Sequence, residues 1–147
     1  MAYECSANQV AQYIPWPGAT RVYHTNHPLA NDDLRLTGEA VAQLSPERQD
    51  RYQKAMANTH TRFASLQLRL ADTARPVTVE KAKEVLSSHD SAEHPVCRHK
   101  IPGQPAMTNA CMAMELSESP ALHVTSGLPC EREFKTLRFQ APRPRPM

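Results

Sequence analysis

Tyr23-His24-Thr25-Asn26-His27-Pro28 is a short apolar run that ends in a polar turn closed by a proline. The run feeding it, residues 20–24, is predicted to be a strand. An Asn at the end of a rigid strand can direct its side-chain amide at a substrate oxygen, and one such donor is typically worth about 3 kcal/mol of barrier. Asn also favours turns for conformational reasons alone. The segment therefore makes Asn26 a candidate oxyanion donor, with an ordinary turn residue as the alternative.

Strand signals lie on both sides of this turn. Residues 3–14 are predicted to form two short strands joined at Ser6-Ala7-Asn8. After Asn31-Asp32-Asp33, which opens a polar loop, no further strand is predicted until the C-terminal third. There we expect strands over residues 107–116, 122–125 and 134–139, the first two as a hairpin across residues 117–120.

Helices are predicted between the two groups of strands. Ser45-Pro46-Glu47 combines a helix-capping residue with a proline at the first helical position, so a helix should begin there and continue to residue 57. The cap-type residues 58–61 are predicted to interrupt it before a second helix over residues 62–71. Thr78 is predicted to cap a helix over residues 79–86. The order strands, helices, strands predicts an α+β fold with a mainly antiparallel sheet and two or three helices.

Length and composition exclude several classes of protein. The 147 residues correspond to one domain or part of a larger one, which we place at residues 1–140, with a disordered Pro/Arg tail at 141–147. A net charge of +2, with Lys and Arg scattered along the chain, predicts no nucleic-acid partner. Nothing approaches the roughly 18 apolar residues of a membrane span. The start of the chain does not look like a signal peptide, so we expect a cytoplasmic protein with reduced cysteines.

A segment rich in histidine and cysteine follows residue 88, in a predicted loop. His89, His94, Cys97 and His99 have side chains that zinc accepts. Structural zinc sites usually show pairs spaced as Cys-x-x-Cys or His-x₃₋₅-His, and here only His94 and His99 come near such a spacing. From the sequence we therefore predict neither a metal nor another cofactor.

Five motifs follow one another in a definite order along the chain. They are Tyr3-x-x-Ser6-Ala7-Asn8-Gln9, His24-Thr25-Asn26-His27, Thr61-Arg62 opening a helix, Ser88-His89-Asp90 before His94-Pro95-Val96-Cys97-Arg98-His99, and Met114-Glu115-Leu116 leading to Gly127-Leu128-Pro129-Cys130-Glu131. In this order the motifs resemble the isopenicillin N acyltransferase-like family. These enzymes are cysteine N-terminal nucleophile hydrolases, related to penicillin V acylase and bile salt hydrolase. The resemblance covers the chain from Tyr3 to about Leu137.

The resemblance implies a fold and an activity. Such enzymes have a four-layer αββα sandwich and cut their own precursor to expose an N-terminal cysteine, which carries out acyl transfer or hydrolysis of a linear amide. In relatives an Asn of the Thr-Asn turn lies beside the reacting carbonyl, and an Arg early in a later helix lies near the nucleophile. By motif these positions are Asn26 and Arg62 here, and Thr61 stands where relatives often carry Ser. Without the resemblance, Arg62 would be read as a solvated helical arginine paired with an acid.

One departure from the family concerns the nucleophile. The family's cysteine lies well upstream of the Thr-Asn turn, whereas Cys5 is the sole cysteine before Asn26 and its surroundings match a later strand. We therefore interpret the chain as a C-terminal portion, inactive alone, whose partners are the upstream nucleophile-bearing portion of the same enzyme and a small-molecule amide or acyl donor. The alternative is a non-catalytic half-domain that associates with another chain through an exposed sheet edge and an apolar face.

Overall fold

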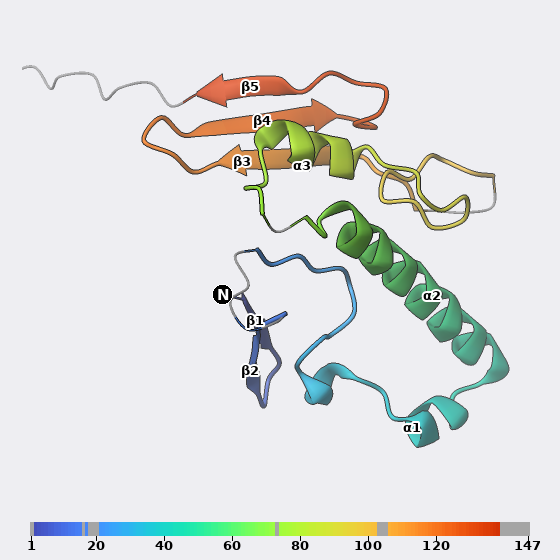
Figure 1. Cartoon of the computed structure of the whole chain (residues 1–147). Helices are drawn as coiled ribbons and strands as arrows, with labels where there is room; N and C mark the ends of the chain where they lie inside the picture. The colour runs from blue at the N-terminus through green and yellow to red at the C-terminus, as the bar shows by residue number, and fades with distance from the viewer. Residues whose placement is uncertain (1, 16, 18–20, 73, 103–105, 139–147) are drawn as a thin grey trace, which may run out of the picture. The chain divides into compact units, whose positions relative to one another are not determined.

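The computed structural model describes residues 2–15, 17, 21–72, 74–102 and 106–138. The chain divides into two compact units, Met1–Thr73 (unit 1) and Ala74–Met147 (unit 2). Both contain helices and strands, and every strand pairing in the described residues is antiparallel (Figure 1). The predicted α+β class with antiparallel sheet is therefore confirmed. The tail predicted at 141–147 lies outside the described residues.

Unit 1 begins with the hairpin that the sequence predicts. Strands β1 (Ala2–Cys5) and β2 (Val10–Tyr13) pair with Ala2 opposite Tyr13 and Cys5 opposite Val10. In the turn, the N–H of Ser6 donates to the carbonyl of Gln9 over 2.8 Å, and the Ser6 hydroxyl oxygen accepts from the N–H of Gln9 over 3.0 Å. Local turn chemistry therefore supports this hairpin, and the side chains of Asn31 and Asp33 add contacts from outside it.

The strand expected over residues 20–24 is wrong for its described part, 21–24, which has no regular structure. Side chains hold this segment in place of a strand ladder. The Arg21 guanidinium donates to the carbonyl of Leu70 over 3.0 Å, and the His24 ring nitrogen Nε2 lies 2.7 Å from a Glu4 carboxylate oxygen. Because these partners are distant in sequence, the local apolar pattern could not reveal them.

The rest of unit 1 contains a 3₁₀ turn, η1 (Asp32–Leu34), and helices α1 (Gly38–Ala42) and α2 (Pro46–Arg69). Helix α2 begins at Pro46 as predicted, but the predicted interruption at residues 58–61 is wrong because the helix runs through without a break. The residues 58–61, although of types that often cap helices, do not end or begin a helix here. Thr59 is instead buried, and its hydroxyl bonds to the Asn26 turn. Helix α1, which starts at the Thr37 cap, was not predicted.

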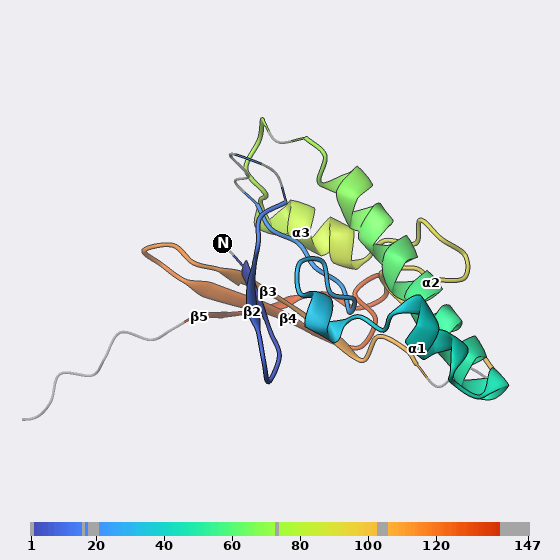
Figure 2. The same ribbon diagram turned by 90° about the horizontal axis from the view of Figure 1, so that it is seen from below.

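Unit 2 contains helix α3 (Val79–Leu86) and a three-stranded sheet in the order β3 (Ala110–Glu115), β4 (Ala121–Ser126), β5 (Lys135–Arg138). The Thr78 cap is confirmed, since its hydroxyl oxygen accepts from the N–H of Lys81 over 3.1 Å. The strand predicted over residues 122–125 is confirmed in full. Those predicted over 107–116 and 134–139 are confirmed at 110–115 and 135–138, whereas residues 107–109, 116 and 134 are not in strands. Helix α3 packs against β3 (Figure 2), and the described residues between α3 and β3 contain no helix or strand, as predicted up to residue 105.

Few apolar side chains are buried. Among the described residues the buried apolar ones are Val85, Pro95, Cys97, Ala121 and Pro129, all of unit 2. The buried residues described in unit 1 are polar: Glu4, Thr25, His27, Asn31, Thr59 and Ser65. Unit 1 is therefore organised around hydrogen bonds, and its large apolar side chains remain near the surface.

Candidate functional site

The Asn26 turn rests on a buried hydrogen-bond network with helix α2. The Thr25 hydroxyl donates to the carbonyl of Thr59 over 3.1 Å, and the Thr59 hydroxyl donates to the Thr25 oxygen over 2.9 Å. The His27 ring nitrogen Nδ1 lies 3.0 Å from both hydroxyl oxygens, and the N–H of Asn26 donates to the Thr59 oxygen over 2.9 Å. Main chain and side chains of the turn are thus fixed to one position on α2.

Proton counting assigns the state of His27. Each threonine hydroxyl has one proton, and the donations from Thr25 to the Thr59 carbonyl and from Thr59 to Thr25 use both of them. The two contacts of Nδ1 then need a proton on Nδ1 itself. Burial and the neighbouring rings of His60 and His24 lower the pKa of His27, so its imidazole is neutral near pH 7. The assignment leaves Nε2 with its lone pair.

The other end of the turn is held by the Glu4 carboxylate, which is buried at β1. Its oxygens accept from the main-chain N–H groups of Leu29, Ala30 and Asn31 over 2.6, 2.7 and 2.7 Å. The Asn31 side-chain amide in turn donates a hydrogen bond to the main-chain carbonyl of Glu4 over 3.1 Å. Burial raises the pKa of the Glu4 carboxyl, but these N–H donors and His24 outweigh burial and lower the pKa from 4.5 to about 2.

We expect this carboxylate to make unit 1 acid-labile. A group whose folded pKa lies below its unfolded pKa stabilises the fold above the unfolded value and loses that contribution as the pH falls. The window for Glu4 runs from about pH 4.5 down to about 2, and the loss amounts to roughly 3 kcal/mol. Amide hydrogen exchange of residues 29–31 measured across this range should report it. Unchanged protection of these amides at pH 2 would contradict the prediction.

Asn26 lines a cleft of about 590 Å³, the Asn26 cleft. The cleft is lined by Ala2, Tyr3, Glu4, His24, Thr25, Asn26, His27 and Pro28. No described residue hydrogen-bonds the Asn26 side-chain amide, whereas the residues on either side of it are held by the contacts above. The Asn26 amide thus lies beside a cleft on a fixed main chain, with no hydrogen-bond partner among the described residues.

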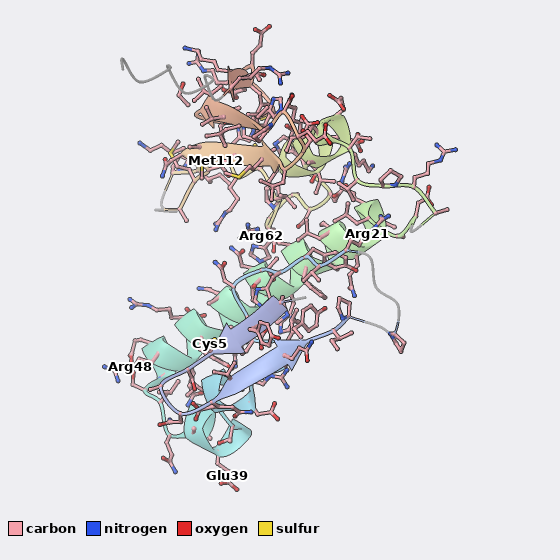
Figure 3. The ribbon with its side chains drawn as sticks, turned by 90° about the vertical axis from the view of Figure 1, so that its left-hand side faces the viewer. Cys5, Arg21, Glu39, Arg48, Arg62 and Met112 are labelled. Atoms are coloured by element: carbon pink, nitrogen blue, oxygen red, sulfur yellow. The ribbon has the colours of Figure 1, made fainter. Side chains whose placement is uncertain are left out.

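The other two predicted site residues lie on α2. Arg62 lies on the C-terminal half of the helix, one turn beyond Thr59, and Thr61 precedes it; both are half-buried (Figure 3). Neither lines the Asn26 cleft. Thr59, Glu4 and His27, which position the Asn26 turn, were not predicted as site residues. The one available signal was the group of cap-type residues at 58–61 in a sequence otherwise typical of a helix.

In unit 2 the loops bring together part of the predicted His/Cys cluster. His89, Cys97 and His99 lie together, but His94 is not part of the group, and its place is taken by Cys130. The ligand-type atoms of the four residues all lie within 4.8 Å of one another. Burial, followed by the neighbouring Cys130 thiol, raises the pKa of the Cys97 thiol to about 11, which is the opposite of what an activated nucleophile shows.

No protein-family model, curated protein or solved structure matches this chain. In the part of the chain that the structure describes, no helix has the length and apolar character needed to cross a membrane. The function must therefore be argued from the motifs and from the geometry of the two sites.

Proposed function

We propose that the chain is the C-terminal portion of a cysteine N-terminal nucleophile acyltransferase or linear-amide hydrolase, located in the cytoplasm and completed by an upstream portion that carries the cysteine. The observation that supports this best is the Asn26 turn, whose amide lies beside a cleft while hydrogen bonds hold its main chain at both ends. Catalytic donors need this fixed placement, because a donor that must reorganise during the reaction contributes less.

The proposed chemistry assigns each residue a step. The thiolate of the upstream cysteine attacks the amide carbonyl, and the negative charge that forms on its oxygen is stabilised by the Asn26 side-chain N–H. The carbon–nitrogen bond then breaks, the amine leaves with a proton, and a thioester remains. Water gives the acid by hydrolysis, and a second amine gives a new amide. Arg62, with Thr61, orients the nucleophile or a substrate carboxylate, for which a guanidinium fork is suited.

Exposed apolar side chains support the view that the chain is part of a larger domain. Leu68 on α2 is 74% exposed, and Met112 on β3 is 68% exposed (Figure 3). Leu116, just after β3, is 82% exposed. Met112 and Leu116 stand four residues apart, at alternating positions of β3 and the residue after it, so their side chains fall on one side of the strand, and a contiguous exposed apolar patch marks an interface. In an αββα sandwich, the missing portion would cover these faces with a second sheet and further helices.

A non-catalytic half-domain is the second candidate function. The specific observation in its favour is that β3 is an edge strand of its sheet and carries the exposed Met112 and Met114. Such an edge can pair with a strand of another chain without any catalysis. Both candidates need a partner, so binding alone does not separate them.

Enzyme activity of this chain combined with its upstream portion tests the proposal. The coding DNA upstream of the Met1 codon is read for a segment with a cysteine at a processing site, and that segment is co-expressed with this chain. We expect the pair to hydrolyse acyl p-nitroanilides of graded acyl length, while each part alone and a pair with that cysteine changed to alanine release no nitroaniline. A stable complex without turnover would support the half-domain, and an upstream region without such a segment would contradict the catalytic proposal.

A further inference from the structure

We propose that unit 2 binds one Zn²⁺ ion through His89, Cys97, His99 and Cys130. Their ligand atoms form a compact cluster: the two Sγ atoms lie 3.4 Å apart, Cys130 Sγ lies 3.3 Å from His99 Nε2, and the two histidine Nε2 atoms lie 3.1 Å apart. Two thiols and two imidazoles are a common tetrahedral donor set for zinc.

These distances are close to the edges of a zinc tetrahedron. Zinc–sulfur bonds of about 2.3 Å and zinc–nitrogen bonds of about 2.05 Å at tetrahedral angles give edges of about 3.8 Å between sulfurs, about 3.6 Å between sulfur and nitrogen, and about 3.3 Å between nitrogens. The three measured contacts are shorter than these edges by about 0.4, 0.3 and 0.2 Å. The remaining separations extend to 4.8 Å at most, about 1 Å longer than a tetrahedral edge, so side-chain movements of about 1 Å or less would bring the four atoms around one ion.

Hydrogen bonds hold the segments that carry Cys97, His99 and Cys130. Cys97 is fixed to the end of α3 by its N–H, which donates to the carbonyl of Ser88 over 3.0 Å. The loop between Cys97 and His99 is tied down at Arg98, whose N–H donates to the Thr108 hydroxyl over 2.9 Å. The turn that carries Cys130 is held by the Ser87 hydroxyl, which donates to the carbonyl of Pro129 over 3.0 Å.

A carboxylate orients one of the ligands. Glu131 Oε1 lies 3.4 Å from Nδ1 of His99, on the side of the ring opposite to the cluster. Histidines that bind metals almost always donate their other N–H to such a group, which fixes the tautomer and turns the free nitrogen lone pair towards the ion. The Nε2 atoms of His99 and His89 face each other. A cation between them would accept a lone pair from each nitrogen and remove the repulsion between the two lone pairs.

Four protein ligands leave no position open for water or substrate, so the proposed role is structural. The ion would join three segments that follow α3, precede β3 and follow β4. Few described apolar side chains of unit 2 are buried, so a metal would supply part of the cohesion that a small core lacks. They are Val85, Pro95, Cys97, Ala121 and Pro129. The main competing arrangement is a disulfide between Cys97 and Cys130, whose sulfurs are neighbours in the same cluster.

Metal analysis of the full chain tests the site. The chain is produced without a polyhistidine tag, dialysed against metal-free buffer with a thiol reductant, and measured by plasma mass spectrometry. We expect one zinc per chain, retained by Cys111→Ser and His94→Ala and lost by Cys97→Ser and Cys130→Ser. Removal of zinc from the native chain by a chelator should lower the melting temperature of unit 2 by about 10 °C or more.

Cobalt binding to the native chain tests the site even if a cysteine variant folds poorly. Co²⁺ added to the zinc-free native chain should give the intense visible bands of a tetrahedral ion and a thiolate charge-transfer band, both weakened in Cys130→Ser and unchanged in Cys111→Ser. Less than a tenth of an equivalent of zinc together with a pale six-coordinate cobalt spectrum would overturn the proposal. A Cys97–Cys130 disulfide that persists under reductant would also overturn it. Neither readout depends on catalytic activity, so the outcome is independent of the proposed function.

Discussion

Glu4→Gln is expected to destabilise unit 1 by about 4 kcal/mol. The carboxylate accepts three main-chain N–H groups and contacts the ring of His24, and charge-assisted hydrogen bonds of this kind contribute about 1.5–3 kcal/mol each, without adding fully. A glutamine amide has one acceptor oxygen, and its NH₂ group faces N–H donors. The variant therefore leaves one or two of the buried or part-buried N–H groups at residues 29–31 without an acceptor.

Hydrogen exchange read by mass spectrometry measures this effect where it arises. The protection factors of the amides of residues 29–31 should fall about 1,000-fold in Glu4→Gln, and their dependence on pH between 4.5 and 2 should disappear once intrinsic exchange rates are divided out. The matched control is Glu39→Gln on α1, an exposed carboxylate (Figure 3), which should change the exchange of these amides by less than threefold. If both variants behave alike, the Glu4 carboxylate does not hold the turn.

Local chemistry made much of the fold predictable. The hairpin turn at Ser6, the start of α2 at Pro46 and the Thr78 cap are each indicated within about four residues, and each is confirmed. The predictions that were wrong share a different cause. The unbroken α2 depends on Thr59 bonding to the Asn26 turn, and the irregular segment 21–24 is held by Glu4 and Leu70. Contacts across 20 to 49 residues leave no trace in a periodic pattern.

The two candidate sites differ in how many of their residues could be predicted from the sequence. Asn26 could be identified because a turn residue before a proline-closed segment is a local feature. The metal cluster could be identified only in part: three ligands lie within 11 residues, but Cys130 is 31 residues beyond His99 and joins them through the fold of the sheet. Because Cys130 is so distant in sequence, the predicted group included His94 in its place, since His94 has the better spacing with His99.

Asn26→Ala in the completed enzyme is expected to lower kcat by a factor of about 10² to 10³, the usual cost of removing one oxyanion donor. KM should change much less, because the donor acts on charge that develops in the transition state and not on the bound substrate. The measurement is steady-state release of p-nitroaniline by the co-expressed pair. Asn109→Ala, which removes an exposed Asn of unit 2, is the control and should leave kcat within twofold.

Stability separates this role from a structural one. The hydrogen bond that ties the turn to α2 uses the main-chain N–H of Asn26, which alanine retains, and no described residue contacts the side-chain amide by a hydrogen bond. Asn26→Ala should therefore leave the unfolding free energy of unit 1 within about 0.5 kcal/mol of the native value. Asn26→Asp, which has the same shape but presents an acceptor to the oxyanion, should be at least as inactive as the alanine variant. If Asn26→Asp keeps native kcat, the Asn26 side chain is not the oxyanion donor, however well its turn is placed.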